Sequence, residues 1–214
     1  MTSTATTAAA AAGTQQMVCN SITLKGSVDI VTEFFEYGIN SILYQRGLYP
    51  SDRFNQCQKY GLTLLMTIDD KLKTYLQTVL SQLKTFMLAK NVHKVVLVIV
   101  NVENQETVER WEFLIECDQT IGDGETKVVD EKEVQNGIRN VIRQIVASVT
   151  FLPLLEGKFI FDILLYTDKN TDLPSALWLD SNPHLIPNAE EVELKNFSTN
   201  IHKVKAMVSY KNCE

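Results

Sequence analysis

The chain has 214 residues, of which 45% are hydrophobic, so it is long enough to bury one sizeable core. Its formal net charge of -6 gives no attraction to phosphate, which argues against nucleic acid as the primary ligand and against an anionic membrane surface. No apolar run approaches the roughly 18 residues of a membrane span, so we predict no membrane insertion. The 4 cysteines are widely spaced, which predicts free thiols in a reducing compartment.

The N-terminal part of the chain predicts a tail followed by a buried helix. Residues 1–16 are a Thr/Ala/Gln tract without a charge, from which we predict a disordered tail over residues 1–19 and one domain over residues 20–214. Apolar residues recur at steps of three and four over residues 27–46. They cover so much of the circumference that the helix is expected to lie centrally, with Ser27 as its N-cap.

The next part of the chain predicts a second helix and a hairpin. Asp69 is expected to cap a helix that runs to about residue 91 and packs one apolar face. Residues 54–66 are ambiguous, with a short strand suggested at their end. Residues 94–100 and 108–117 predict two strands of a hairpin, because apolar and polar residues alternate in the second of them.

An acidic residue lies on the apolar face of the second hairpin strand. Glu109 alternates with Trp111 on the face expected to be buried, where an unpaired charge costs on the order of several kcal/mol. Arg46, in the last turn of the first helix, is the candidate partner. The alternatives are that Glu109 lies at the exposed entrance of its strand and that Arg46 only complements the helix dipole.

A third helix is predicted after a polar loop. Residues 118–130 are mostly polar and contain Gly-Asp-Gly, which is typical of a mobile loop. Asp130 opens a helix that we expect to run to about residue 152. Arg139 and Arg143 are four residues apart on its outer side. They either are solvated or form a basic docking ridge.

The last third of the chain is more than an ordinary core needs. Residues 159–166 form a nearly continuous apolar run, which is typical of a strand covered on both faces. A passage punctuated by prolines follows, and strand patterns then occupy residues 193–199 and 201–210. Residues 166–214 are too long for a connection and too apolar for a tail. We interpret them as a movable arm that pairs with the body and traps a partner peptide at an exposed sheet edge.

The sequence offers no constellation of catalytic residues. His93, His184 and His202 are scattered and lack metal-ligand spacing, and no nucleophile elbow, Walker lysine or dinucleotide fingerprint occurs. We therefore expect a non-enzymatic interaction module without a metal or other cofactor. A small enzyme remains the alternative, and its sign would be a polar pocket converging on His202 or Cys117.

Several runs are similar to the HORMA-domain family, and most closely to its spindle-checkpoint members. The match is colinear from about residue 20 to the end. The runs that carry it are residues 34–50, which include Gly-Ile-Asn-Ser-Ile-Leu-Tyr-Gln-Arg-Gly, and residues 59–65, 108–113, 142–145, 150–155, 201–204 and 207–211. The resemblance implies an α+β HORMA fold, with three main helices on a mostly antiparallel sheet and a mobile C-terminal safety belt at about residues 166–214.

The resemblance also implies a function. A HORMA checkpoint adaptor switches between an open and a closed state and straps a partner peptide under its belt. The implied partners are a coiled-coil kinetochore checkpoint protein, the activator of the anaphase-promoting complex, a second copy of the chain, and a HORMA-remodelling ATPase with its adaptor. Sequestering the activator delays anaphase, and the expected locations are nucleus, kinetochore and cytoplasm. An adaptor of another complex, such as translesion DNA synthesis, is the alternative.

The resemblance assigns residues to three roles. The surface for self-pairing or partner docking carries over onto Arg143, Gln144 and Phe151. The peptide-binding edge and belt comprise Phe161, Ile163, Leu165, Tyr166, Trp178, His202 and Val204. The balance between the two states is assigned to Leu24, Arg46, Glu109 and Trp111.

Overall fold

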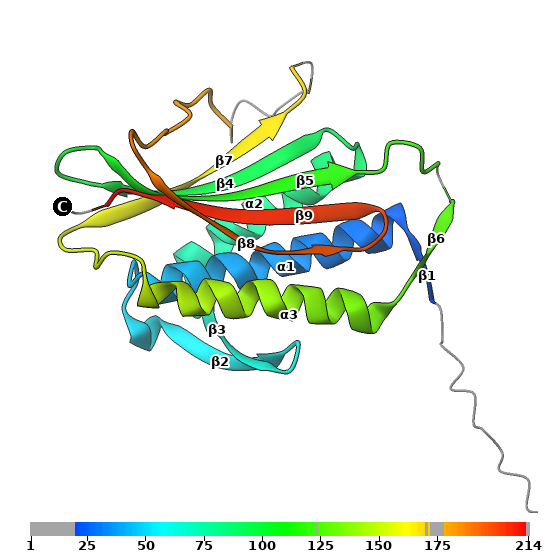
Figure 1. Cartoon of the computed structure of the whole chain (residues 1–214), viewed down its shortest axis with the longest axis horizontal. Coiled ribbons are helices and arrows are strands. Elements are labelled where there is room, and N and C mark those ends of the chain that lie inside the picture. The colour runs from blue at the N-terminus through cyan, green and yellow to red at the C-terminus, as the bar shows by residue number, and fades with distance from the viewer. Residues whose placement is uncertain (1–19, 123, 170, 172–177, 213–214) are drawn as a thin grey trace, which may run out of the picture.

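Helices cover one face of a five-stranded sheet in the computed structural model, which describes residues 20–212 except 123, 170 and 172–177 (Figure 1). The helices within this part of the chain are α1 (Leu24–Gln45), α2 (Asp70–Leu88) and α3 (Glu131–Ala147), with short 3-10 turns η1 (Ser51–Arg53) and η2 (Ser148–Thr150). The predicted α+β class, with three helices on an antiparallel sheet, is confirmed.

The sheet has the strand order β7-β4-β5-β9-β8, and all of its neighbouring strands are antiparallel. Its members are β4 (Val92–Asn101), β5 (Thr107–Cys117), β7 (Phe159–Thr167), β8 (Glu190–Ser198) and β9 (His202–Tyr210). There are also two separate two-stranded antiparallel sheets. One pairs β1 (Asn20–Thr23) with β6 (Thr126–Val129), and the other pairs β2 (Phe54–Lys59) with β3 (Leu62–Thr67). The ambiguous stretch 54–66 is therefore a hairpin.

Helix α1 is the centre of the core, as its wide apolar surface predicted. Phe34 and Phe35 are both fully buried, and their rings lie 5.4 Å apart. The predicted N-cap at Ser27 is wrong, because the Thr23 hydroxyl caps the helix by accepting a hydrogen bond from the Gly26 N–H at 3.1 Å. Ser27 consequently lies inside the first turns and is buried.

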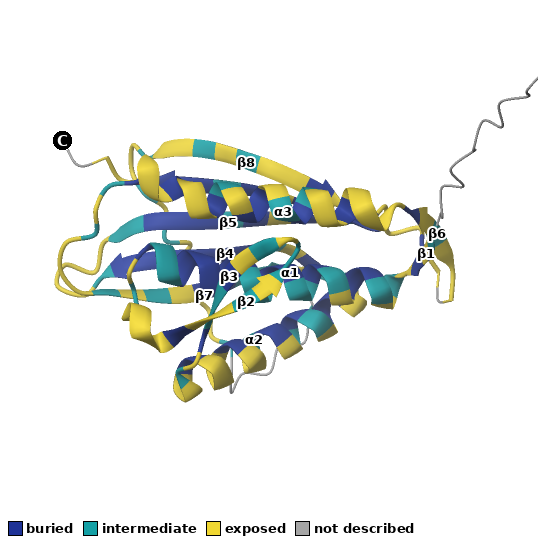
Figure 2. Ribbon diagram, turned by 90° about the horizontal axis from the view of Figure 1, so that it is seen from below, coloured by how far each residue is buried: buried dark blue, intermediate teal, exposed yellow. Residues whose placement is uncertain are grey.

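The hairpin of β4 and β5 has two buried faces of unequal size. Trp111, Phe113 and Ile115 face the helices, as predicted, and join the main core. The alternate residues Val96 and Val98 of β4 face the other way and form a second apolar cluster on what we call the outer face of the sheet. Figure 2 shows the buried positions concentrated on the strands and on the helix sides turned toward them.

Three further predictions need correction. Strand β7 was expected to be covered on both faces, but Ile160 is 53% exposed and Asp162 is exposed, because β7 is an edge strand. The polar loop 118–130 contains β6, which pairs with β1. Helix α3 ends at Ala147 rather than near residue 152, and Val149 beyond its end is 47% exposed.

Candidate functional site

The C-terminal hairpin forms one side of the sheet. Strand β9 pairs with β5 and β8 pairs with β9, so both predicted strands of the arm exist. The register sets Val204 opposite Ile115 and His202 opposite Cys117. Val204 and His202 are both 1% exposed, so these two residues are interior members of the hairpin. Two strands, β4 and β5, separate them from β7, so the structure does not bring them to the β7 edge.

Strand β7 has a free edge. One side of β7 pairs with β4, and no other described strand pairs with its second side. Phe161 points toward the helix layer, where its ring lies 5.8 Å from that of Tyr75. Burial and the neighbouring Asp162 carboxylate raise the pKa of Tyr75 to about 12. An unpaired row of backbone groups beside aromatic side chains can accept an added strand.

The residues of β7 assigned to the site divide between its two faces. Phe161, Ile163 and Leu165 pack against the main core on the helix side. Tyr166 packs with the second cluster on the outer face. A peptide added to this edge would therefore meet side chains from both faces.

A segment of the arm passes from one face of the sheet to the other. On the helix side, the Trp178 Nε1–H donates to Gln82 Oε1 at 2.5 Å, and its ring lies 6.4 Å from that of Phe86 in α2. On the outer face, the Pro183 carbonyl accepts from Arg110 Nε at 3.2 Å. We call residues 178–186 the crossing segment. The part of the predicted belt at residues 172–177 lies outside the described residues.

The tip of the C-terminal hairpin is fixed to helix α1. The Ser27 Oγ lies 2.7 Å from His202 Nδ1 and 2.5 Å from Thr199 Oγ1, and all three side chains are buried. The backbone N–H of His202 donates to Thr199 Oγ1 at 2.9 Å. Burial, and to a lesser extent the charge of Lys90, lowers the pKa of His202 to about 4. The imidazole is therefore neutral at physiological pH and serves as a structural hydrogen-bond partner.

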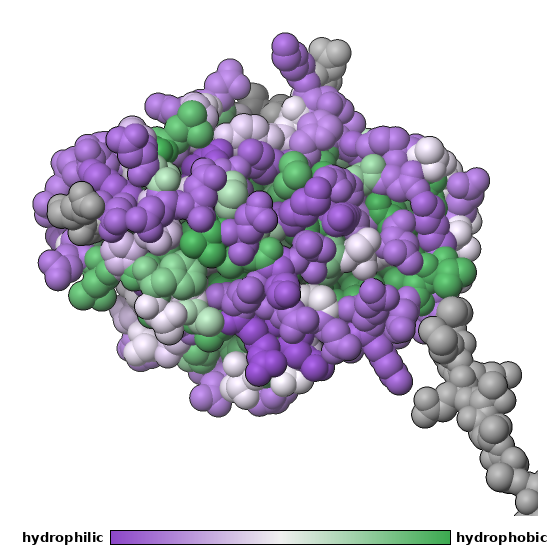
Figure 3. All heavy atoms as spheres, in the orientation of Figure 1, coloured by the Kyte–Doolittle hydropathy of each residue, from purple (hydrophilic) through white to green (hydrophobic). Residues whose placement is uncertain are grey.

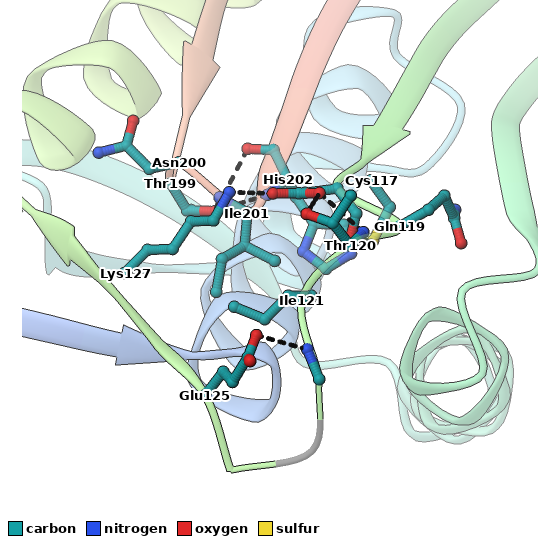
Figure 4. A network of polar contacts seen from close by, with 12 residues as sticks. Cys117, Gln119, Thr120, Ile121, Glu125, Lys127, Thr199, Asn200, Ile201 and His202 are labelled. Atoms are coloured by element: carbon teal, nitrogen blue, oxygen red, sulfur yellow. Dashed lines mark hydrogen bonds and ion pairs between the residues drawn. The ribbon is translucent and has the colours of Figure 1, made fainter.

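The loop after β5 also contacts this tip (Figure 4). The Asp118 N–H donates to the Ile201 carbonyl at 2.8 Å. Asn200 Nδ2 donates to the Val128 carbonyl at 2.7 Å, and Lys127 forms an ion pair with Asp118. The loop predicted to be mobile thus contacts the turn of the hairpin.

The buried ion pair between Arg46 and Glu109 is present. Arg46 Nε donates to both Glu109 oxygens, at 2.7 and 3.0 Å, and Trp111 Nε1 donates to Glu109 Oε2 at 3.1 Å. Burial raises the pKa of the Glu109 carboxyl, and the hydrogen bonds from Arg46 and Trp111 oppose that rise. Glu109 is 1% exposed, so the alternative of an exposed strand entrance is wrong. Leu24, the first residue of α1, packs against the same core.

The residues assigned to docking, on α3 and just beyond its end, have different surroundings. Arg143 is exposed, and Phe151 is 41% exposed with its ring 6.2 Å from that of Tyr210. Gln144 is half-buried, and its Oε1 accepts a hydrogen bond from the Lys195 N–H of β8. Arg139 is half-buried as well, since its Nε donates to the Tyr60 carbonyl at 2.7 Å. The face with α3 toward the viewer is mostly hydrophilic with separate hydrophobic patches (Figure 3).

Sequence reasoning missed Arg110 and Thr199. The signal for Arg110 was available, because it is a charged residue on the strand face opposite Trp111. For Thr199 the sequence held no such signal, since its partner Ser27 is 172 positions away. Within the described residues, no group of His, Cys, Asp and Glu side chains has the arrangement of a metal site. None of the described helices is long and apolar enough to cross a membrane.

Comparisons with known proteins place the chain in a family. A human protein named mitotic spindle assembly checkpoint protein MAD2A is 54% identical over 191 residues, covering 89% of this chain and 93% of its own length. The mitotic spindle checkpoint component MAD2 of Saccharomyces cerevisiae is 50% identical over 193 residues, covering 89% and 98%. A chain in a crystal structure of the mitotic checkpoint complex is 43% identical, with a TM-score of 0.80 over 87% of this chain and 99% of its own.

The family model of the HORMA domain matches residues 27–202, which begin in the first turn of α1, include α2 and α3, and reach the first residue of β9. The chain therefore belongs to the HORMA-domain family.

Proposed function

We propose that the chain is a non-enzymatic adaptor of the spindle assembly checkpoint that captures a partner peptide and retains it beneath its C-terminal segment. The observation that carries this proposal is the free edge of β7 with the crossing segment passing beside it. An extended peptide added to β7 gains main-chain hydrogen bonds, and a segment lying over it slows its release. The names of the related proteins support the checkpoint and favour it over an adaptor role in another complex.

The partners follow from this reading. A coiled-coil kinetochore checkpoint protein and the activator of the anaphase-promoting complex supply the peptide, and holding the activator delays anaphase. The chain accordingly works in the nucleus, at kinetochores and in the cytoplasm. A match to a chain of the mitotic checkpoint complex supports work within a multiprotein assembly.

The arm has two positions in this proposal. In the present structure the hairpin β8–β9 pairs with β5, which leaves β7 available, and this corresponds to the closed state. In the open state residues 166–214 lie on a different edge. Leu24, Arg46, Glu109 and Trp111 influence the balance, since they join the start and end of α1 to β5 in one core.

A second surface lies on α3 and just beyond its C-terminal end. Arg143, Gln144 and Phe151 form it, and a second copy of the chain docks there. The proposal includes a remodelling ATPase with its adaptor, which returns the closed state to the open one. The exposure of Arg143 and Phe151 supports a docking role for these two side chains.

Peptide release tests the proposal directly. The probe is a fluorescent peptide with a basic residue, two apolar residues, a further apolar residue two positions on, and a downstream proline. We expect the wild-type chain to form a slowly dissociating complex. Trp178→Ala removes the contact with α2 and should accelerate dissociation about tenfold or more, because an aromatic side chain that anchors an interface as a hot spot costs about 2 kcal/mol or more when it is truncated.

The matched control is Leu179→Ala, one residue further along the same segment, because Leu179 is 84% exposed. Its release rate should equal that of the wild type. A wild-type complex that dissociates as fast as a scrambled peptide, or equal rates for Trp178→Ala and Leu179→Ala, would contradict peptide retention by this segment.

A further inference from the structure

A buried cationic side chain lies on the outer face of the sheet, where the crossing segment meets it. Arg110 is 5% exposed, although it follows Glu109 and precedes Trp111, which face the opposite side. All three nitrogens of its guanidinium have partners. Nε donates to the Pro183 carbonyl at 3.2 Å, one Nη donates to the Tyr166 hydroxyl at 3.0 Å, and the other forms an ion pair with Glu112.

These acceptors come from three separate parts of the chain. Glu112 belongs to β5, Tyr166 to the end of β7, and Pro183 to the crossing segment. The first two are themselves held in place, because Lys94 Nζ lies 2.7 Å from Glu112 Oε2 and 5.2 Å from the centroid of the Tyr166 ring. The sheet thus presents a preorganised donor to the crossing segment.

The chemistry of this contact requires arginine. A guanidinium is planar, always charged and presents its donors on three separate nitrogens in a fixed fork, whereas a lysine ammonium carries its three donors on one nitrogen at the end of a flexible stem. A hydrogen bond from a charged donor in a water-poor site is stronger than one between neutral groups. The acceptor on the crossing segment is a backbone carbonyl, so the contact fixes the path of the chain independently of its side chains.

We propose that Arg110 is a positioning residue that holds the crossing segment against the outer face and thereby sets the rate at which a peptide beneath that segment is released. This inference rests on the proposed function, because a release rate exists only if a peptide is held. It adds a residue of β5 that contacts the belt rather than the peptide.

The first experiment needs no peptide. Amide hydrogen exchange is measured across residues 178–186 in the full chain and in Arg110→Lys and Arg110→Met, of which the second keeps the apolar stem of the side chain. We expect exchange of the His184 N–H, which donates to Asn182 Oδ1 at 3.3 Å next to the Arg110 contact, to rise about tenfold in both variants, since the hydrogen bond that fixes the neighbouring Pro183 carbonyl is lost. Exchange in β4 and β9 should stay at the wild-type level, which shows that the sheet remains folded.

The second experiment measures peptide release with the fluorescent probe described above. The dissociation rate should rise about tenfold in Arg110→Lys and Arg110→Met, while the association rate changes less than about threefold. The control is Lys205→Ala, which removes another cation of the outer face, whose ion pair is with Glu116 of β5 rather than with the crossing segment. Failure of lysine to rescue release distinguishes the three-way geometry of the guanidinium from charge alone.

The outcomes separate the two proposals. Unchanged exchange in residues 178–186 overturns the role of Arg110, and so does an unchanged release rate in a wild type that retains peptide. A wild type that retains no peptide contradicts the proposed function instead. In that case raised exchange in the Arg110 variants still supports the contact with the crossing segment.

Discussion

His202 shows how one buried side chain makes the stability of the fold sensitive to pH. Its pKa is about 4 in the folded chain, against an ordinary value near 6.5, because burial disfavours the charged imidazolium. The unfolded chain therefore binds a proton first as the pH falls. Stability from this group is fully present above about pH 6.5 and is lost as the pH drops from about 6.5 toward 4.

We predict a loss of about 1 kcal/mol from this group between about pH 7.5 and pH 5.5, measured by urea unfolding. The comparison is with His202→Asn, which cannot take up a proton and should lack this part of the pH dependence. All other ionisable groups are the same in both proteins, so their contributions cancel in the difference. Parallel pH profiles for the two proteins would show that His202 does not have a lowered pKa.

The partner of Glu109 was predictable from the sequence, whereas the role of Ser27 was not. Glu109 was predictable, because an acid on an alternating apolar face needs a buried cation, and Arg46 supplies it. Ser27 was assigned to the wrong role. Its hydroxyl belongs to a network with Thr199 and His202, and a helix-capping pattern cannot reveal a partner 175 residues away.

At the scale of elements, α3 and β8 form one surface rather than two. Gln144 of α3 accepts a hydrogen bond from the Lys195 N–H, at the place where the pairing of β8 with β9 shifts register. Gly137 lies beneath the same strand, because a Cβ built there would be 2.7 Å from Phe197 Cβ. The part of α3 next to the docking residues therefore depends on the hairpin being in its present position.

Self-association should separate the roles of two neighbouring α3 residues. Arg143→Glu reverses an exposed charge, so it should raise the dimer dissociation constant at least about tenfold without changing the free energy of unfolding. Gln144→Ala should weaken both, because it also removes the contact with β8. Analytical ultracentrifugation and urea unfolding measure the two quantities. Lys132→Glu, an exposed charge reversal in the first turn of α3, is the control, and an Arg143→Glu protein that dimerises as well as this control would exclude the proposed surface.

Element types were predictable where periodicity is strong, and their partners were not. The stripes of α1 and α2 and the alternation in β5 identified those elements, with errors of a few residues at the ends. The run 159–166 was misassigned to a strand covered on both faces. Some of its apolar side chains pack on the helix side and others in the outer-face cluster, while Ile160 at the free edge is exposed. Hydropathy alone does not distinguish these three environments.

At the scale of the whole molecule, the sheet has two places where a strand pair can be added. The three strands β7, β4 and β5 form a unit with one edge at β7 and the other at β5. The C-terminal hairpin pairs with the β5 edge. Alternation in residues 201–210 predicts a strand but is equally satisfied at either edge, since it fixes only which side chains face the helices. The choice depends on the contacts of the tip and of the crossing segment, which are long-range and invisible in the sequence.

A reversible covalent lock tests whether the hairpin must leave β5 for a peptide to enter. The register sets Leu114 opposite Lys205, and both residues are exposed, so Leu114→Cys together with Lys205→Cys places a disulfide between β5 and β9. If entry requires the hairpin to detach, oxidation before peptide addition should slow association by at least about 100-fold, because the disulfide holds the hairpin and a reductant is needed to free it. Oxidation after peptide addition should instead slow release, since the same bond keeps the belt closed.

Stopped-flow fluorescence with and without reductant measures both rates, and each single-cysteine variant controls for the native thiols. Association that is equally fast in the oxidised and reduced proteins would mean that peptides enter without movement of the hairpin, which would leave the crossing segment alone as the gate.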